Sequence, residues 1–280
     1  MSWLEAIILG IVQGLTEFLP ISSTGHLRIV PAFAGWSDPG AAFTAIVQLG
    51  TTLAVLIYFR EDLLRVARAW FRSLRDPSVR GDVDARLGWY LIIATIPIVI
   101  FGFIFKDQIE TGARDLYLIG IVLILFSFVM LAAERMGRQV RDEKSVVRRD
   151  AIVIGLAQAL ALVPGVSRSG STISAGLFLG MKREVAARFS FLMSLPAIVL
   201  AALFEMRGVI SGSDALETKA GESISAGEVV VSCFFAFVVG YFAIAFLLRF
   251  LTRHGLEVFV VYRIVLGIAV LALVSSGAIS

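Results

Sequence analysis

Two short segments of the sequence contain polar residues that could act on an anionic substrate. In the first, Gln13 and Glu17 are four residues apart, a spacing that puts both side chains on one face of a helix. Hydroxyl groups and a histidine follow, at Ser22, Ser23, Thr24 and His26. The second segment places a basic residue among hydroxyl groups and a glycine, at Ser167, Arg168, Ser169, Gly170, Ser171 and Thr172.

These residue types suit the chemistry of a phosphate ester. Arg168 carries a planar, permanently charged set of donors that matches phosphate oxygens. His26 can transfer a proton or attack phosphorus near neutral pH, and Glu17 can deprotonate a neighbour or help to bind a divalent cation. Hydroxyl groups and backbone amides at helix starts can surround the phosphate. The groups expected to bind phosphate are Gln13, Ser22, Thr24, Ser167, Ser169, Gly170, Ser171 and Thr172.

Each of these residues also has a purely structural interpretation. The hydroxyl groups at residues 22–24 could only cap the helix that follows. His26 could be a structural histidine, and Arg168 could be the counter-ion of Glu17. Gln13 and Gln158 occupy equivalent places in the two segments and could share a structural role. The sequence leaves these alternatives open.

The elements that position these residues belong to a membrane protein. Of the 280 residues, 58% are hydrophobic and 17% are charged. The apolar residues form runs long enough to cross about 30 Å of hydrocarbon as helices. Six such runs occur, at Ala41–Phe59, Leu87–Phe105, Leu116–Ala133, Ala186–Phe204, Val229–Leu248 and Val258–Ser276. We therefore predict an all-α, multi-pass membrane protein with about six transmembrane helices.

The distribution of basic residues predicts the orientation. If residues 1–36 enter and leave on one side, 18 of the 25 Lys and Arg residues fall in loops on a single face. Five fall on the other face, at Arg28, Lys106, Arg114, Arg207 and Lys219. Because basic loops face the cytoplasm, both termini are expected outside.

An internal repeat relates the two polar segments. Residues 10–25 and 155–170 share Gly, Gln, Leu, Ser and Gly at the same spacing, with an offset of 145 residues. The charge distribution starts the two copies on opposite sides of the membrane, so the repeats are inverted. We expect one membrane domain over residues 1–280, with a first repeat at 1–145 and a second at 146–280.

Each copy predicts two half-helices separated by a break rich in Pro, Gly and Ser. The half-helices, at Leu4–Phe18 and Gly25–Phe33 and at Ile152–Val163 and Ser171–Leu179, are too short to span the membrane. Irregular backbone inside a membrane must line a cavity or be buried in protein, and inverted repeats place functional sites near the midplane. We predict two re-entrant hairpins that meet there. The alternative is two ordinary kinked spans.

Several classes of function are disfavoured. The single cysteine, Cys233, leaves no disulfide framework and no Cys-based metal site. No basic segment interleaved with aromatic residues lies outside the spans, which argues against nucleic acid as a partner. A transporter is the main rival, because inverted repeats and broken helices are typical of secondary transporters. The clustering of nucleophile, base and anion-binding groups at membrane depth favours an enzyme.

Two motifs resemble a known family. Residues 13–26, Gln-Gly-Leu-Thr-Glu-Phe-Leu-Pro-Ile-Ser-Ser-Thr-Gly-His, and residues 164–170, Pro-Gly-Val-Ser-Arg-Ser-Gly, are similar to the two signatures of the undecaprenyl-diphosphate phosphatase family of the bacitracin-resistance type. Residues 47–50, Val-Gln-Leu-Gly, also resemble that family. The likeness covers essentially the whole chain. Gln13 stands where many members have Glu, which the family pattern admits.

The resemblance implies a function. It implies hydrolysis of undecaprenyl diphosphate to undecaprenyl phosphate and inorganic phosphate in the bacterial inner membrane, with the site open to the exterior. It also implies that the catalytic residues are Glu17, Ser23, His26 and Arg168 and that Mg²⁺ or Ca²⁺ supports activity. By its own chemistry, Glu17 is the residue expected to bind that cation. Attack by Ser23, by His26 or by water stays open. A homodimer is one assembly that the sequence allows.

Overall fold

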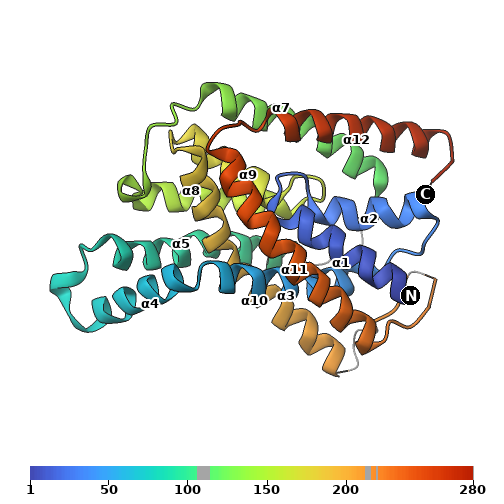
Figure 1. The fold of residues 1–280 in the computed structure, drawn as a ribbon, viewed down its shortest axis with the longest axis horizontal. Helices are drawn as coiled ribbons and strands as arrows, with labels where there is room; N and C mark the ends of the chain where they lie inside the picture. Colours follow the sequence, from blue (N-terminus) through green and yellow to red (C-terminus); the bar gives the residue numbers. More distant parts are fainter. Residues whose placement is uncertain (106–113, 212–215, 219, 280) are drawn as a thin grey trace.

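The computed structural model describes residues 1–105, 114–211, 216–218 and 220–279, without the side chains of 202 and 204–211. Lys106, Lys219 and the side chain of Arg207, which the orientation argument counts, lie outside this description. In the described part all the named elements are helices (Figure 1). Six are long and apolar enough to cross a membrane, which confirms the predicted fold class. They are Gly40–Tyr58 (α3), Val83–Ile104 (α5), Leu116–Met136 (α7), Arg183–Ala201 within α10 (Arg183–Ser211), Ala226–Leu251 (α11) and Glu257–Ser275 (α12).

Two pairs of shorter helices form hairpins where the sequence predicts half-helices. Trp3–Phe18 (α1) and Ser23–Ala34 (α2) form the first, and Arg148–Ala159 (α8) and Arg168–Phe178 (α9) form the second. The longest of the four, α1, has 16 residues, and at 1.5 Å per residue it extends only about 24 Å. None of them can therefore cross about 30 Å of hydrocarbon alone. A short 3₁₀ turn, Leu160–Leu162 (η3), follows α8.

The two hairpins break in the same way. Ser22 and Ser167, which are 145 residues apart, have φ angles of 78° and 73°. This left-handed conformation is uncommon for residues other than glycine. Each serine precedes a helix and accepts a hydrogen bond from the backbone N–H three residues later, at Gly25 and Gly170. The paired turns agree with an internal repeat, and the repeat limits at residues 145 and 146 stay a prediction.

Glycine allows each hairpin to contact a spanning helix at backbone distance. α1 packs along α11, and α8 packs along α5. A Cβ atom on Gly10 would lie 2.4 Å from the carbonyl oxygen of Ser232, and one on Gly155 would lie 2.6 Å from that of Ala94. Gly10 and Gly155 are again 145 residues apart, and both serve the close packing typical of small residues in membrane helices.

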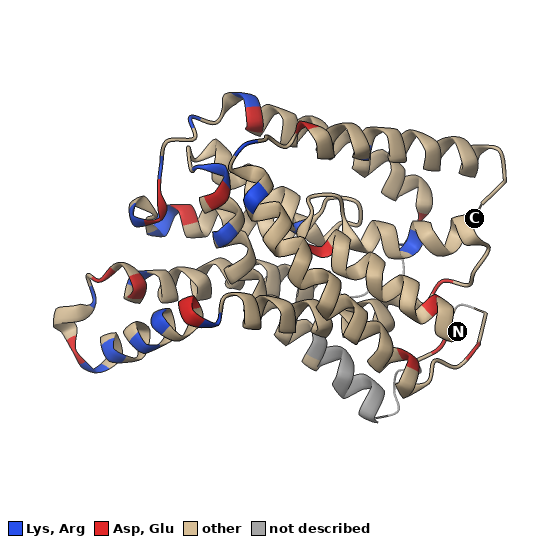
Figure 2. Ribbon diagram, viewed as in Figure 1, with Lys and Arg blue, Asp and Glu red and all other residues tan. Residues whose placement is uncertain are grey.

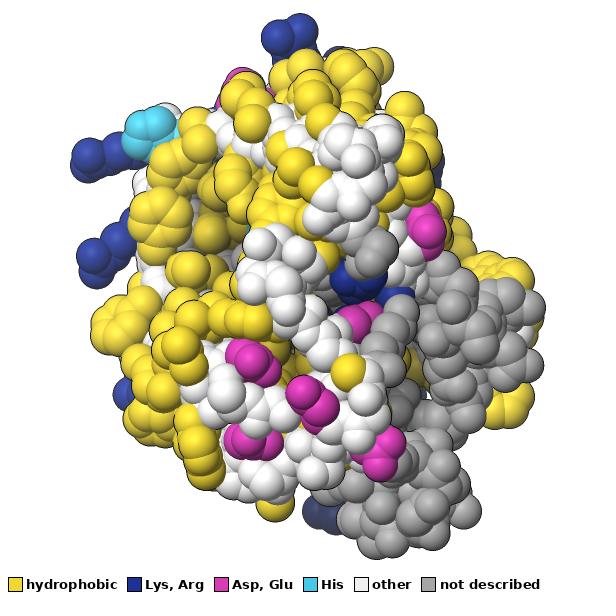
Figure 3. Space-filling model, turned by 90° about the vertical axis from the view of Figure 1, so that its right-hand side faces the viewer, with side chains coloured by type: hydrophobic (Ala, Val, Ile, Leu, Met, Phe, Trp, Pro, Cys, Tyr) yellow, Lys and Arg dark blue, Asp and Glu magenta, His cyan; other side chains and the backbone are white. Residues whose placement is uncertain are grey.

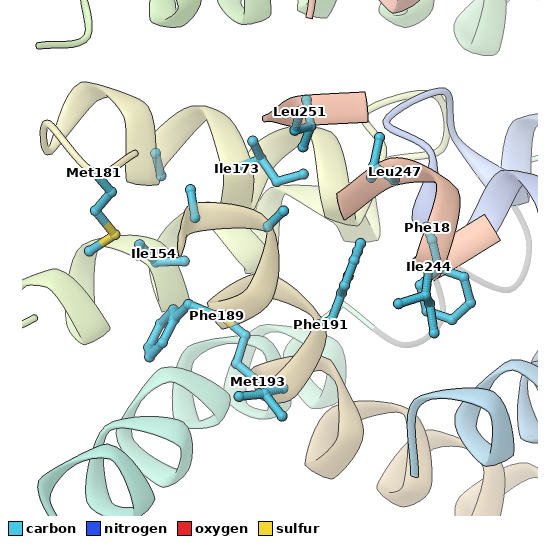
Figure 4. Packing of buried hydrophobic residues seen from close by; sticks show 14 of the residues in the cluster. Phe18, Ile154, Ile173, Met181, Phe189, Phe191, Met193, Ile244, Leu247 and Leu251 are labelled. Atoms are coloured by element: carbon cyan, nitrogen blue, oxygen red, sulfur yellow. The ribbon is translucent and has the colours of Figure 1, made fainter. Parts of the chain in front are cut away.

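An apolar cluster holds the first tip against the spanning helices. Phe18 is fully buried and meets Phe191 of α10 edge to face, with ring centroids 5.3 Å apart. Figure 4 shows the Phe18 ring next to Ile244 of α11, with Leu247 close by. Because Glu17 and Phe18 are adjacent, this packing fixes where the Glu17 side chain emerges.

Charge separates the two ends of the molecule. Both termini lie at one end (Figure 1), and most of the Lys and Arg residues lie toward the other (Figure 2). The basic segment between the first two predicted spans is one of the loops counted for the orientation, but the structure has an amphipathic helix, Arg60–Arg75 (α4), in its first part. Its apolar side packs on α5, where Gly88 leaves room for Trp70. Runs of apolar residues do not reveal α4, because its apolar residues are separated by charged ones at helical spacing.

The glycine contacts generate a stability prediction. Gly10→Ala and Gly155→Ala should each lower the free energy of unfolding by about 1–3 kcal/mol, because the added methyl group forces two helix backbones apart. Gly81→Ala is the matched control, since a Cβ atom there would have no heavy atom within 4 Å. Thermal unfolding in detergent checks this; melting temperatures equal to that of Gly81→Ala would contradict it.

Candidate active site

The turns of the two hairpins meet at the polar end of a cavity of about 530 Å³. Three of the four predicted catalytic residues line it: Glu17, Ser23 and Arg168. α2 begins at Ser23 and α9 at Arg168, so two helix N-termini, which favour negative charge, start at this cavity. The structure therefore brings residues from segments 145 residues apart into one polar site.

The Glu17 carboxylate joins the two tips. Its Oε2 atom accepts hydrogen bonds from Gln13 Nε2 at 2.9 Å and from Ser23 Oγ at 2.7 Å. Its Oε1 atom pairs with the Arg168 guanidinium of the second tip. Arg168 also donates to the carbonyl oxygen of Ser194 in α10, at 3.3 Å. One buried carboxylate thus orients a hydroxyl group and a cation toward the same space.

His26 faces away from this space. Its Nδ1 atom lies 2.7 Å from the carbonyl oxygen of Ser22, and its Nε2 atom lies 2.7 Å from the Tyr262 hydroxyl in α12. Because a carbonyl can only accept, the proton of a neutral ring is on Nδ1 and the Tyr262 hydroxyl donates to Nε2. His26 is absent from the cavity lining. The histidine closes the turn of the first tip and ties it to α12.

The predicted phosphate-binding residues fall into two groups. Ser22, Thr24 and Ser167 line the cavity. Ser22 also caps a helix, as its structural interpretation expects, and Ser167 caps the equivalent helix of the second hairpin. The others are absent from the lining: Gln13 lies in the last turns of α1, and the rest lie in the first turns of α9, at Ser169, Gly170, Ser171 and Thr172.

The hydroxyl groups behind the lining hold the second tip together. Ser169 Oγ donates to the carbonyl oxygen of Leu19 across the two tips, at 3.1 Å. Ser171 and Thr172 both donate to the carbonyl oxygen of Arg168, at 2.9 and 2.7 Å. These contacts position the Arg168 backbone at the start of α9.

The cavity lining also contains charged residues other than the predicted catalytic ones. Arg114 pairs with Asp38 and donates to Thr44 Oγ1 at 3.3 Å, and Arg28 Nε lies 3.5 Å from Asp38. Arg28 and Arg114 line the cavity. Figure 3 shows recessed basic side chains beside an acidic one on the end of the molecule that carries the termini. No local pattern could have found this cluster, because Arg114 is 76 residues from Asp38 in the chain.

One further polar residue and an apolar wall complete the cavity. Gln48 of α3, which belongs to the Val-Gln-Leu-Gly motif at residues 47–50, also lines the cavity. The remaining lining is mostly apolar and suits a hydrocarbon chain. It comes from α5, the second tip and α10, with Ile98, Val99, Phe103, Leu162, Ile198 and Leu200.

A divalent cation fits this site only with help from a substrate. The described residues contain no group of three His, Cys, Asp or Glu side chains that could hold a metal ion. The Oε1 atom of Gln13 is buried and lacks a hydrogen-bond partner in the described structure, and it lies on the residue that contacts Glu17. Mg²⁺ commonly takes one or two protein oxygens together with substrate phosphates, so Glu17 and Gln13 could supply the protein share.

Comparison with known proteins identifies the family. The family model described as bacitracin resistance protein BacA matches residues 6–269. The chain belongs to this family. It is 54% identical to proteins named undecaprenyl-diphosphatase from Mycobacterium sp. (strain KMS) and Mycolicibacterium smegmatis, covering 100% of this chain and 99% of each relative. A protein of the same name from Nocardioides sp. is 49% identical with the same coverage.

The cluster formed by Arg28, Asp38 and Arg114 generates a prediction about the pH dependence of stability. Burial alone would raise the pKa of Asp38, but the hydrogen bonds and charge of Arg114 outweigh it and hold this pKa below its ordinary value of 3.8. A lowered pKa in the folded state stabilises the protein at neutral pH, and this contribution is lost as the pH falls through the lowered pKa. Asp38→Asn should therefore cost about 3 kcal/mol of unfolding free energy at pH 7.

Thermal unfolding at pH 7 and at pH 3 checks this prediction. The melting temperature of Asp38→Asn should lie well below that of wild type at pH 7, and this difference in melting temperature should be smaller at pH 3. Equal gaps at the two pH values would contradict the pairing.

Proposed function

We propose that this chain hydrolyses undecaprenyl diphosphate to undecaprenyl phosphate and inorganic phosphate. The supporting observation is the junction of the two tips, where Ser23 and Glu17 of one meet Arg168 of the other. The apolar wall of the same cavity suits the polyprenyl chain, and the name of the relatives agrees. Such an enzyme recycles the lipid carrier for cell-wall synthesis and confers bacitracin resistance.

Ser23 is the nucleophile that the geometry favours. Its hydroxyl group lines the cavity and donates to Glu17 at 2.7 Å, so the carboxylate can take the proton as the oxygen attacks. The Ser23 oxygen then bonds to the terminal phosphorus, and the bond from that phosphorus to the bridging oxygen breaks. Undecaprenyl phosphate leaves, and a phosphoserine remains.

Water completes the cycle by hydrolysing the phosphoserine. Glu17, now holding the proton from Ser23, returns it to the serine oxygen as the phosphorus–oxygen bond breaks and inorganic phosphate forms. The guanidinium group of Arg168 and the N-termini of α2 and α9 stabilise the charge on the phosphoryl oxygens in both steps. His26, which faces Tyr262 instead of the cavity, supports the tip and does not attack.

A bound divalent cation would add charge neutralisation to this arrangement. Glu17 and Gln13 are the residues that would hold it together with the diphosphate oxygens. The cation would lower the negative charge of the diphosphate.

The charge distribution supports an orientation in the bacterial inner membrane. Lys and Arg concentrate at the end of the molecule opposite the termini (Figure 2), and basic segments stay in the cytoplasm. The termini and the cavity end with Arg28 and Arg114 would then face the exterior, where the diphosphate head enters.

Phosphate release in detergent tests the function. Wild type should release inorganic phosphate from a polyprenyl diphosphate with Mg²⁺ or Ca²⁺ supplied. Ser23→Ala should lower kcat by roughly 10³-fold or more, and Arg168→Ala by roughly 10²- to 10³-fold. The matched controls are Ser78→Ala and Arg75→Ala, which change exposed residues far from the cavity.

The same assay separates the enzyme from a transporter. Folded wild type that releases no phosphate would contradict the proposal and favour transport of an anion or a lipid, since a transporter alone does no hydrolysis. Full activity in Ser23→Ala would exclude the serine as nucleophile.

A further inference from the structure

We propose that Arg263 is a positioning residue that holds the two re-entrant tips in register for the reaction. The inference rests on the proposed function, because the relative position of the two tips matters for that reaction. Arg263 lies in α12, outside both hairpins, and its side chain is fully buried. It is absent from the cavity lining, so it can act only through the residues that it holds.

The Arg263 guanidinium group contacts both tips at once. Its Nη2 atom donates to the carbonyl oxygen of Gly165 in the second tip at 2.7 Å. Its Nη1 atom lies 3.4 Å from the carbonyl oxygen of Pro20 in the first tip. Its Nε atom donates to Ser127 Oγ of α7 at 3.1 Å. One side chain from a third element therefore bridges the two breaks.

The two carbonyl groups occupy equivalent positions. Pro20 and Gly165 are 145 residues apart, the offset of the repeat. Each lies three residues before a residue of the site, Ser23 in one tip and Arg168 in the other. A single guanidinium group thus fixes the same backbone point in both turns, and with it the spacing between the hydroxyl group and the cation.

The neighbouring residue strengthens the attachment of the first tip. The Tyr262 hydroxyl donates to His26 Nε2, and the His26 Nδ1 atom binds the carbonyl oxygen of Ser22. Consecutive residues of α12 therefore hold the first tip at two carbonyl groups, one of them through the histidine. The second tip is held at Gly165, whose φ of +94° and whose contact with α7 both require glycine.

Burying the Arg263 guanidinium group costs free energy, which indicates that the residue has a specific role. A charged group at membrane depth is expensive, and the partners of Arg263 in the described structure are neutral: two carbonyl groups, a hydroxyl group and the ring of Phe126 at 5.8 Å. An apolar residue of similar size would avoid that cost but could not bind two carbonyl groups. The planar donor fork of arginine can bind both in fixed directions, which a lysine ammonium does less well.

The inference predicts a defect in turnover and not only in stability. Displacement of reacting groups by about 1 Å can cost on the order of 100-fold in rate. Arg263→Met should therefore lower kcat per folded molecule by on the order of 100-fold with a much smaller change in KM. Arg263→Lys should recover part of that loss.

The control is a different arginine, Arg183, which makes its contacts far from the tips. Arg183→Met removes the pairing of Arg183 with Glu134 at the basic end of the molecule. It should lower stability and leave kcat per folded molecule near that of wild type. Hydrogen–deuterium exchange of residues 19–24 and 163–168 gives a second readout that needs no activity: exchange should rise in both tips for Arg263→Met and in neither for Arg183→Met.

A double-mutant cycle separates positioning from loss of folded protein. If Arg263 acts by placing Ser23, Arg263→Met should add little to the defect of Ser23→Ala. Fully multiplicative losses, an unchanged kcat in folded Arg263→Met, or unchanged exchange in both tips would each overturn the inference. If wild type releases no phosphate, the proposed function fails, and the exchange experiment alone then decides whether Arg263 holds the tips.

Discussion

A helix that breaks inside a membrane exposes backbone and side-chain polar groups that hydrocarbon cannot satisfy. This chain has two such breaks, and polar groups of the two turns bind each other. The Glu17–Arg168 pair is the centre of that solution, because each charge would be costly alone and each comes from a different tip. The pair also leaves Ser23 in contact with a carboxylate. The need to pair the buried charges of Glu17 and Arg168 therefore also brings the groups of the candidate site together.

The surrounding elements keep the two tips in place. Glycines at equivalent positions let α1 and α8 approach α11 and α5 at backbone distance. Phe18 anchors the residue next to Glu17 in an apolar cluster, and α12 contributes Tyr262 and Arg263 at the turns. The cavity then offers polar groups at one end and an apolar wall along its side, as an amphipathic lipid diphosphate requires.

Much of this arrangement could be predicted from the sequence because strong physical constraints act on short segments. Long apolar runs predict the six spans, and polar residues inside apolar surroundings predict Glu17, Ser23 and Arg168 as neighbours. His26 was expected beside them, but its side chain points to α12, since the direction of one side chain depends on which partner lies behind the turn. The partners of Arg263 and the cluster around Asp38 could not be predicted, because only the tertiary fold brings these groups together.

The identity of the phosphorylated group tests the account most directly. A polyprenyl diphosphate labelled in its terminal phosphate would be mixed with the enzyme and quenched rapidly with denaturant. The account predicts a label on Ser23 that is stable to acid and labile to alkali, and that is missing in Ser23→Ala. An acid-labile label on His26, or steady turnover with no labelled protein at any time, would contradict it.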